Sequence, residues 1–174
     1  SAVSGKGNAA LAGCPKPTIA MIRGYCIGGG LLVALQCDIR IASTDAKLAA
    51  VFAKRGVLPE SGGSWLLPRL LGWPKAAEIA FRGQTLSAQE CLEVGLVNHV
   101  VDDGGALDRA KEIASVINAN GPLAVKSLLK TLRETNGMEE TEALTYEFSY
   151  GWDVFGSEDA KEGPRAFKEK RTPN

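Results

Sequence analysis

The chain has 174 residues, 45% of them hydrophobic, and its 20 basic and 20 acidic side chains give a formal net charge of zero. This length and composition are typical of a folded domain with a sizeable core, and they exclude a disordered chain. Basic residues are not gathered into a block, which argues against nucleic acid and anionic membranes as partners, because both are bound through clustered positive charge.

The cysteine pattern limits the chemistry further. Cys14, Cys26, Cys37 and Cys91 are scattered without a C-x-x-C pair, and His99 is the only histidine. This spacing predicts reduced thiols rather than a zinc site or a disulfide framework, so no metal is expected. No apolar run reaches membrane-spanning length, and no signal-peptide pattern opens the sequence. We therefore expect a cytoplasmic protein without a membrane partner.

Strand and helix patterns alternate in the first part of the chain. After a short helix expected over residues 8–12, an apolar, β-branched run predicts a buried strand over residues 18–22. Three glycines follow, and an almost wholly apolar run predicts a helix over residues 31–35. Two more strands are expected over residues 38–42 and 47–50, because a turn-rich Ser-Thr-Asp segment separates them.

The next segment is predicted to be mainly helical. A helical turn over residues 51–55 and a loop over residues 56–63 lead into a helix over residues 64–71, which a glycine ends. Pro74 suits the first turn of the following helix, which extends to about residue 82.

A capping box is predicted at Ser87 and Glu90, whose side chains can each satisfy a backbone donor of the other residue. A helix should therefore begin after Ser87, and Gly95 should end it. The apolar residues 96–101 predict one more strand.

Only helices are predicted in the remainder of the chain. Apolar residues recur at helical spacing from residue 106, after Pro122 and over residues 144–155. Pro164 is predicted to break residues 157–170 into two short helices.

This change of pattern divides the chain into residues 1–105 and residues 106–174. Each amphipathic helix of the second part has an apolar face that needs a surface to cover. We expect these helices to fold back on the first part or to form a subunit interface.

Gly28, Gly29 and Gly30 lie between a predicted strand and a predicted helix. The first N–H groups of a helix have no partner within it and carry partial positive charge, and glycine has no Cβ to keep a ligand atom away from them. An oxyanion could bind there. By themselves, however, the glycines favour a structural turn over an anion site.

Several motifs occur in a characteristic order between Lys16 and Arg171. They occupy residues 16–20, 24–30, 37–39, 56–59, 62–63, 67–70, 87–90, 95–97 and 162–171. Together they resemble the enoyl-CoA hydratase/isomerase, or crotonase, superfamily. The resemblance is closest to isomerase-like members, which carry an acid in the Val-Leu-Pro-Glu-Ser-Gly-Gly loop around Glu60.

The resemblance implies an α/β fold, namely a ClpP/crotonase-type spiral of ββα units that is present here in part. Residues 1–105 match the spiral core without its usual N-terminal part, so we expect the chain to be a fragment. Residues 106–174 match the C-terminal helical region, which in the family makes trimers or dimers of trimers. The implied partner is an acyl-CoA thioester, and because coenzyme A is part of that substrate, no separate cofactor is expected.

The resemblance also implies a catalytic role for Gly29. In the family, the matching glycine donates its backbone N–H to the thioester oxygen, and such a fixed donor stabilises the enolate that forms during the reaction. The second oxyanion donor and most contacts to the adenosine of CoA belong to an N-terminal block that this chain does not contain.

The two glutamates of the family's hydratases are replaced by Leu32 and Phe52 at the matching positions. Neither side chain can take a proton from water, so the resemblance favours an isomerase over a hydratase. The acid that is present is Glu60, which matches the acidic residue of several isomerase branches and could move a proton between two carbons of an enolate. The alternative role for Glu60 is a first-turn acid that faces the helix dipole.

Substrate contacts are implied at a further set of positions. They are Cys26, Gly28, Leu32, Phe52, Trp65, Phe167 and Lys170. Arg23, Cys26 and Trp65 are expected to line the acyl pocket. Phe167 and Lys170 match a region that approaches CoA bound by a neighbouring subunit, and the alternative for both is a solvated, amphipathic helix.

Three functions therefore stay open. The favoured one is a double-bond isomerase that acts on an enoyl-CoA thioester through enolate stabilisation. A second is an enoyl-CoA hydratase, or another thioester reaction on the same scaffold in which Glu60 activates water. A third is a catalytically inactive acyl-CoA-binding or assembly subunit, because both hydratase acids are missing.

Overall fold

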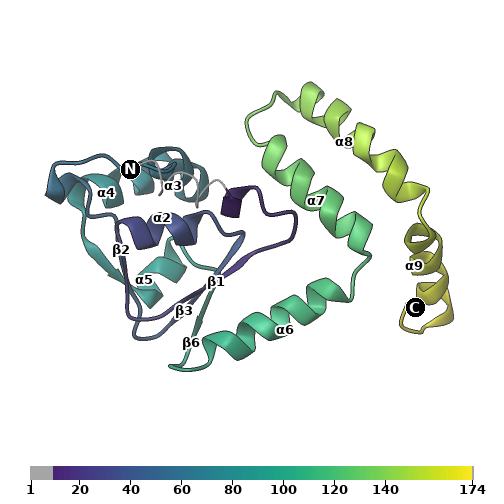
Figure 1. Ribbon diagram of the computed structural model, residues 1–174, viewed down its shortest axis with the longest axis horizontal. Coiled ribbons are helices and arrows are strands. Elements are labelled where there is room, and N and C mark those ends of the chain that lie inside the picture. The colour runs from purple at the N-terminus through teal and green to yellow at the C-terminus, as the bar shows by residue number, and fades with distance from the viewer. Residues whose placement is uncertain (1–9, 174) are drawn as a thin grey trace. The chain divides into compact units, whose positions relative to one another are not determined.

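The computed structural model describes residues 10–173 of the chain (Figure 1). Contacts divide the chain into two compact units, residues 1–113 and residues 114–174. Helix α6 (Ala106–Asn118) contains the boundary between them. The short helix predicted over residues 8–12 begins outside the described residues, and residues 10–12 are helical.

The first unit contains two three-stranded sheets. One sheet has the order β1-β3-β6 and is wholly parallel, with Ile19 opposite Ile39 and Ile41 opposite His99. In the other, β2 pairs with β4 in parallel and β4 with β5 in antiparallel. The strands are β1 (Ile19–Ile22), β2 (Tyr25–Ile27), β3 (Ile39–Ser43), β4 (Lys47–Ala49), β5 (Thr85–Ser87) and β6 (His99–Val101).

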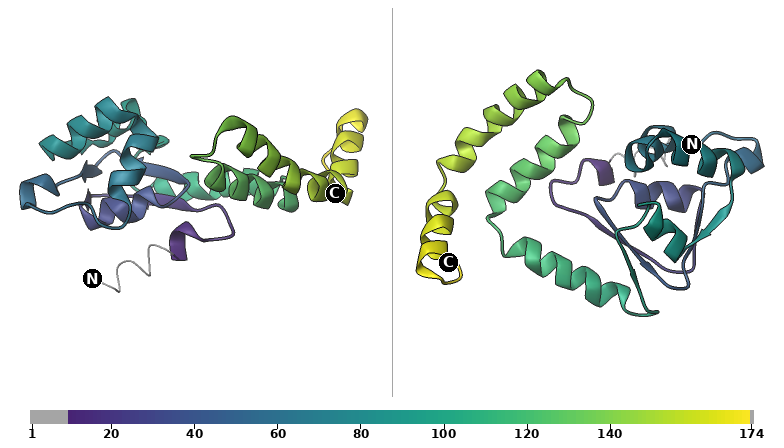
Figure 2. Two further views of the ribbon diagram at one scale, coloured as in Figure 1. Left: turned by 90° about the horizontal axis from the view of Figure 1, so that it is seen from above. Right: turned by 180° about the vertical axis from the view of Figure 1, so that it is seen from behind.

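The chain winds through these sheets as a spiral. Each of the first two turns adds one strand to each sheet and then forms helices, and Figure 2 shows the helices from two more sides. Helix α2 packs on β2, and α5 packs on β4, β5 and β6. The helical segments are α2 (Gly29–Leu35), the 3₁₀ turn η1 (Ala53–Arg55), α3 (Gly63–Leu71), α4 (Trp73–Arg82) and α5 (Ala88–Glu93).

Two aspartates fix how successive turns of the spiral meet. The backbone N–H and hydroxyl of Thr18 donate to Asp38 Oδ2 at 2.7 and 2.8 Å, which aligns β1 with β3. Asp45 accepts from the Ser43 hydroxyl and from the Gly24 N–H, the latter at 3.1 Å. The Ser43 hydroxyl, followed by the Gly24 N–H, lowers the pKa of Asp45, because both stabilise its charged form.

A buried arginine joins the parallel sheet to the segment that enters β6. Arg40 is 4% exposed, and its guanidinium donates to the carbonyl oxygens of Leu96 at 2.8 Å and Cys37 at 2.7 Å. Its backbone N–H donates to Asn98 Oδ1 at 2.8 Å. Burial lowers the pKa of Arg40. These bonds compensate the desolvation of the guanidinium and fix the register of the sheet.

The second unit is helical. It contains the end of α6, followed by α7 (Pro122–Glu134), α8 (Glu140–Phe155) and α9 (Glu158–Glu169), and contacts join α7 to α8 and α8 to α9. Large apolar side chains stand exposed on α7 and α8. They include Leu128, Leu132, Phe148, Trp152 and Phe155. None of the described helices is long and apolar enough to cross a membrane.

The predicted break at Pro164 is wrong, because α9 runs through this proline as one helix. The Ser157 hydroxyl caps the helix by accepting from the Ala160 N–H at 3.1 Å. Beyond the proline, Arg171 pairs with Glu162 at 2.5 Å. These interactions hold the helix on both sides of the backbone hydrogen bond that proline removes.

The other differences between the predicted and the observed elements each involve only a few residues. Strands β2 and β5 have three residues each and were not predicted, and α2 begins at Gly29 rather than at residue 31. The capping box is confirmed, because the Ser87 hydroxyl accepts from the Glu90 N–H while the Glu90 carboxylate accepts from the Ser87 N–H.

Candidate functional site

The N-terminus of α2 is open to ligands. Gly28 has a φ of 58°, which favours glycine, and its N–H donates to the Ala49 carbonyl at 3.0 Å. Gly29 is the first helical residue, and the N–H of a first helical residue has no acceptor within the helix. A Cβ on Gly29 or Gly30 would meet nothing within 4 Å. A ligand atom could therefore approach the Gly29 amide closely.

Glu60 lies on an exposed turn that leads into α3, and we call residues 59–63 the Glu60 turn. The Glu60 N–H donates to the Leu58 carbonyl at 2.9 Å. Ser61 has a φ of 61°, in the left-handed region that L-residues rarely adopt, and Gly62 has a φ of 86°. The backbone on the C-terminal side of Glu60 is therefore unusual and must be held by its surroundings.

The Glu60 turn packs directly on α2. The side-chain amide of Gln36, at the C-terminal end of α2, donates to the Ser61 carbonyl at 2.9 Å. A Cβ on Gly63 would lie 2.5 Å from Leu32 Cδ2 and 2.7 Å from Pro59 Cβ, so only glycine fits at this position. The helix that begins with Gly29 and the turn that carries Glu60 are thus neighbouring, interlocked elements.

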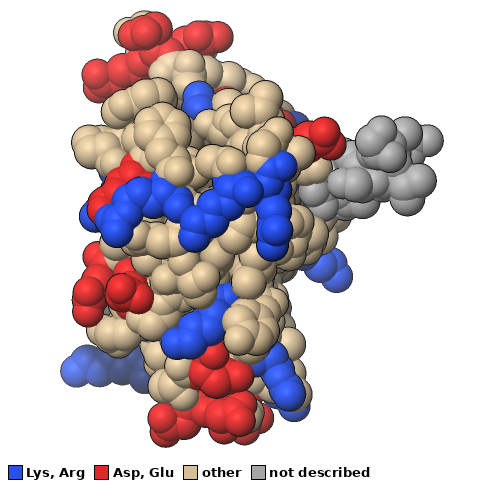
Figure 3. All heavy atoms as spheres, turned by 90° about the vertical axis from the view of Figure 1, so that its left-hand side faces the viewer, with Lys and Arg blue, Asp and Glu red and all other residues tan. Residues whose placement is uncertain are grey.

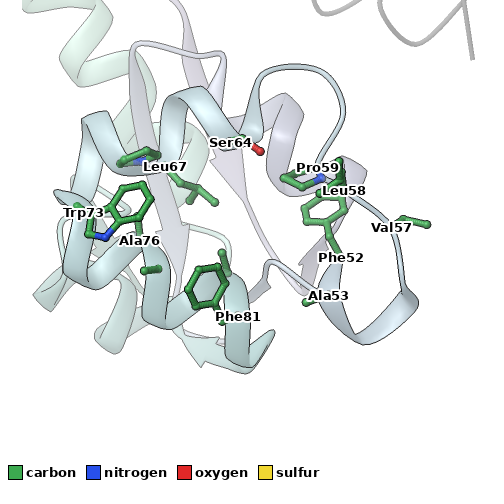
Figure 4. A pocket seen from close by; sticks show the side chains of 13 residues that line it. Phe52, Ala53, Val57, Leu58, Pro59, Ser64, Leu67, Trp73, Ala76 and Phe81 are labelled. Atoms are coloured by element: carbon green, nitrogen blue, oxygen red, sulfur yellow. The ribbon is translucent and has the colours of Figure 1, made fainter.

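An apolar pocket of about 310 Å³ lies in the same unit, and its volume is typical of a small-molecule site (Figure 4). Figure 4 shows Phe52, Leu58 and Pro59 on one side and Leu67, Trp73 and Ala76 on the other. Ser64 supplies the one hydroxyl among the described lining residues. The lining residues are Phe52, Ala53, Val57, Leu58, Pro59, Ser64, Leu67, Pro68, Trp73, Ala76, Ala77, Ala80 and Phe81.

Four of the predicted substrate contacts of the first unit fall into three places. Phe52 lines the pocket, next to Pro59 of the Glu60 turn. Leu32, which is 4% exposed, and Cys26 belong to the buried core. Trp65 lies on α3 outside the pocket lining, with its ring 4.0 Å from the Arg69 guanidinium.

Three of the remaining predicted residues lie elsewhere. Arg23 is exposed, between β1 and β2. Phe167 and Lys170 belong to the second unit, at the C-terminal end of α9. Phe167 is 87% exposed, and Lys170 has a φ of 55°, in the left-handed region.

Sequence reasoning missed Gln36, Trp73 and Phe81. Trp73, Ala77 and Phe81 are spaced four residues apart, and this helical period could have predicted a shared face of α4 that lines the pocket. Gln36 is the first hydrogen-bonding side chain after the apolar run of α2, but its partner is 25 residues away in the sequence.

Charged side chains of both signs are spread over the face in Figure 3, where basic groups form a short band and acidic groups lie above and below it. This mixed pattern agrees with the formal net charge of zero. Among the described residues, no group of three or more His, Cys, Asp or Glu side chains could hold a metal ion.

The buried cysteine thiols are predicted to react slowly with alkylating reagents. Burial raises the pKa of Cys26 to about 11 and that of Cys91 to about 12. Because the thiolate is the nucleophile, a pKa raised by two units should slow the reaction of Cys26 with iodoacetamide at pH 8 by about 100-fold. Peptide mass spectrometry should find partly exposed Cys14 modified first, and all four cysteines modified in denaturant. Equal rates for Cys26 and Cys14 in the folded protein would contradict this burial.

Comparison with protein families places these features in context. The protein-family model described as enoyl-CoA hydratase/isomerase matches residues 5–174 of this chain. Among curated proteins, the chain is 45% identical over 159 residues to enoyl-CoA hydratase EchA19 of Mycobacterium tuberculosis, covering 91% of this chain and 60% of that protein. It is 38% identical over 156 residues to a short-chain-enoyl-CoA hydratase of Clostridium acetobutylicum, covering 90% of this chain and 60% of that protein.

Solved structures share the fold. The chain superposes on the enoyl-CoA hydratase from Bacillus anthracis with a TM-score of 0.96 at 36% identity, covering 99% of this chain and 67% of that structure. The expected α/β arrangement of ββα units with C-terminal helices is thereby confirmed. This chain spans about 60% of the length of the two curated relatives. Both are named hydratases rather than isomerases.

Proposed function

This chain belongs to the enoyl-CoA hydratase/isomerase family, and from that premise we propose that it acts on an enoyl-CoA thioester, first of all by reversible addition of water. The observation that carries the proposal is the interlocking of the Glu60 turn with α2, through Gln36 and Gly63. It supports a site in which a carboxylate and the Gly29 amide serve one substrate. The names of the relatives favour hydration over the isomerase activity expected from the sequence.

One carboxylate can complete a hydration. Glu60 takes a proton from water while the oxygen of that water forms a bond to the β-carbon of the enoyl group. The electron pair of the double bond moves onto the thioester as an enolate, and the Gly29 N–H stabilises its oxygen. The protonated Glu60 then returns the proton to the α-carbon. The net result is the addition of H and OH across the double bond.

A second candidate is double-bond isomerisation, which Leu32 and Phe52 favour. Leu32 is buried and Phe52 lines an apolar pocket, so neither position offers a second acid to hold a water. Isomerisation needs no water: Glu60 removes a proton from the α-carbon of a 3-enoyl thioester and returns it to the γ-carbon of the enolate.

Turnover in H₂¹⁸O separates the candidates. The full-length protein is supplied with a 2-enoyl-CoA and, separately, with a 3-enoyl-CoA, and the products are analysed by mass spectrometry. Hydration adds one ¹⁸O to a 3-hydroxyacyl product, whereas isomerisation yields an unlabelled 2-enoyl product. Binding of the thioesters without any product would overturn both and support a non-catalytic acyl-CoA-binding subunit.

The pocket suggests the class of acyl group. Its lining is almost wholly hydrocarbon, which favours an apolar tail and disfavours a charged one. Each buried CH₂ contributes about 0.8 kcal/mol, so we predict that kcat/KM rises by about fourfold per added CH₂ until the pocket is full. A series of enoyl-CoA substrates of increasing chain length measures this slope.

An Ala77→Phe variant tests whether this pocket holds the tail. The new ring would fill space on the α4 side, so the rise with chain length should end at a shorter substrate. The four-carbon substrate serves as an internal control and should keep its kcat/KM. An unchanged chain-length profile would place the tail elsewhere.

The helical unit supports a proposal about assembly. The exposed apolar side chains of α7 and α8, including Leu132 and Trp152, favour burial against other copies of the chain, as in the trimers that the family resemblance implies. Phe167 and Lys170 stay candidates for contact with CoA on a neighbouring subunit.

A further inference from the structure

Gln36 links the helix that begins with Gly29 to the turn that carries Glu60. Within residues 29–36 its side chain is the only one with a hydrogen-bonding group, and its amide reaches the Ser61 carbonyl at 2.9 Å. We propose that Gln36 is a positioning residue, which holds the Glu60 carboxylate in register with the Gly29 amide. This inference rests on the proposed function, because it assigns a partner to the acid of that site.

The contact between Gln36 and the turn is close. A Cβ on Gly62 would lie 3.2 Å from Gln36 Nε2, so the amide lies against the backbone of residues 61 and 62. Where the turn enters α3, Leu32 of α2 and Pro59 at the start of the turn both lie against Gly63. The turn is thus anchored to α2 by an apolar contact at Gly63 and by a directional hydrogen bond at Ser61.

The backbone at Ser61 explains why a directional bond is needed. Its φ of 61° is unfavourable for a residue with a Cβ, so the turn has a tendency to relax to another conformation. Relaxation of Ser61 from this conformation would shift the turn that carries the Glu60 carboxylate. The bond from Gln36 holds the Ser61 carbonyl, which belongs to the peptide between Ser61 and Gly62, and so opposes that relaxation, because it requires this carbonyl to point toward α2.

The reaction should be sensitive to this anchor. A displacement of about 1 Å in a reacting group can reduce the rate by about 100-fold. The described residues of the apolar pocket do not include Gln36, Glu60 or Ser61. Loss of the anchor should therefore reduce kcat and leave KM nearly unchanged, because the residues proposed to bind the acyl tail stay in place.

Gln36→Met is the main test variant, because methionine has a similar length and no hydrogen-bond donor. We expect kcat to fall by about 10- to 100-fold while KM changes by less than about twofold. Gln36→Lys keeps an N–H donor of similar reach and should restore most of kcat. Gln89→Met, on the exposed surface of α5, is the matched control and should behave as the unmodified protein.

A double-mutant cycle separates positioning from general damage. In a Glu60→Gln background, Gln36→Met should cause little further loss, because the anchored group no longer acts. An equal loss in both backgrounds, a change in KM alone, or an unchanged kcat in Gln36→Met would overturn the inference. If Gln36→Met does not fold, Gln36→Asn, whose shorter amide cannot reach Ser61, decides by the same criteria. A Glu60→Gln variant with full activity would instead overturn the proposed function itself.

Discussion

A Glu60→Gln variant should lose about 10²- to 10⁴-fold in kcat, whichever of the two proposed reactions the protein catalyses. Both reactions require one group that takes a proton and returns it to a different atom. The amide of glutamine matches the carboxylate in shape but cannot accept and release a proton at neutral pH. Measurement of initial rates on 2-enoyl-CoA and 3-enoyl-CoA substrates tests this result.

The matched control is Glu93→Gln, which makes the same change at an exposed position on α5. Its kcat should be unchanged. KM for the substrate should change little in Glu60→Gln, because the amide still fits the turn and the apolar pocket is untouched. The structure excludes Glu60 as a first-turn acid of α3, because the helix begins at Gly63 after its N-cap Gly62. If Glu60→Gln retained full kcat, Glu60 would be only an exposed acid on the turn before α3, and another group would have to move the proton.

The fold was largely predictable from local patterns. The strand at Ile19–Ile22, the helix that ends before Gly72 and the capping box at Ser87 each depend on residues close in the sequence. Strand β2 (Tyr25–Ile27) was missed because three residues are too few to establish an alternating period. Pro164 misled the prediction because the Arg171 to Glu162 ion pair, which supports the helix around it, joins residues nine apart.

The candidate site was predictable only in part. Gly29 and Glu60 could be named from motifs; Gly29 begins α2, and Glu60 lies on the turn that leads into α3, which packs on α2. The bond that joins these elements, from Gln36 to Ser61, spans 25 residues and leaves no periodic signal. The pocket likewise depends on how α4 lies against η1, which a single sequence does not specify.

A Gly29→Pro variant should lose about 10²- to 10³-fold in kcat while it retains the fold. Proline removes the backbone N–H that we propose as the enolate donor, a change that no other standard amino acid makes. Gly29 is the first residue of α2, where proline is favoured and where the missing N–H has no helical acceptor to lose. A Cβ at this position meets nothing within 4 Å, so the β-carbon of the new residue has space.

Gly29→Ala and Gly30→Ala distinguish the loss of a donor from a loss of space. Each adds only a methyl group where no atom lies within 4 Å, and Gly29→Ala keeps the N–H. If the amide stabilises the enolate, Gly29→Pro should lose far more kcat than either alanine variant, at a melting temperature close to that of the unmodified protein.

If Gly29→Ala lost as much activity as Gly29→Pro, close approach of the ligand would be the decisive feature and the amide would not be the donor. Full activity in Gly29→Pro would exclude this helix N-terminus from the reaction, since the charge that develops on the thioester oxygen would then be stabilised by other groups.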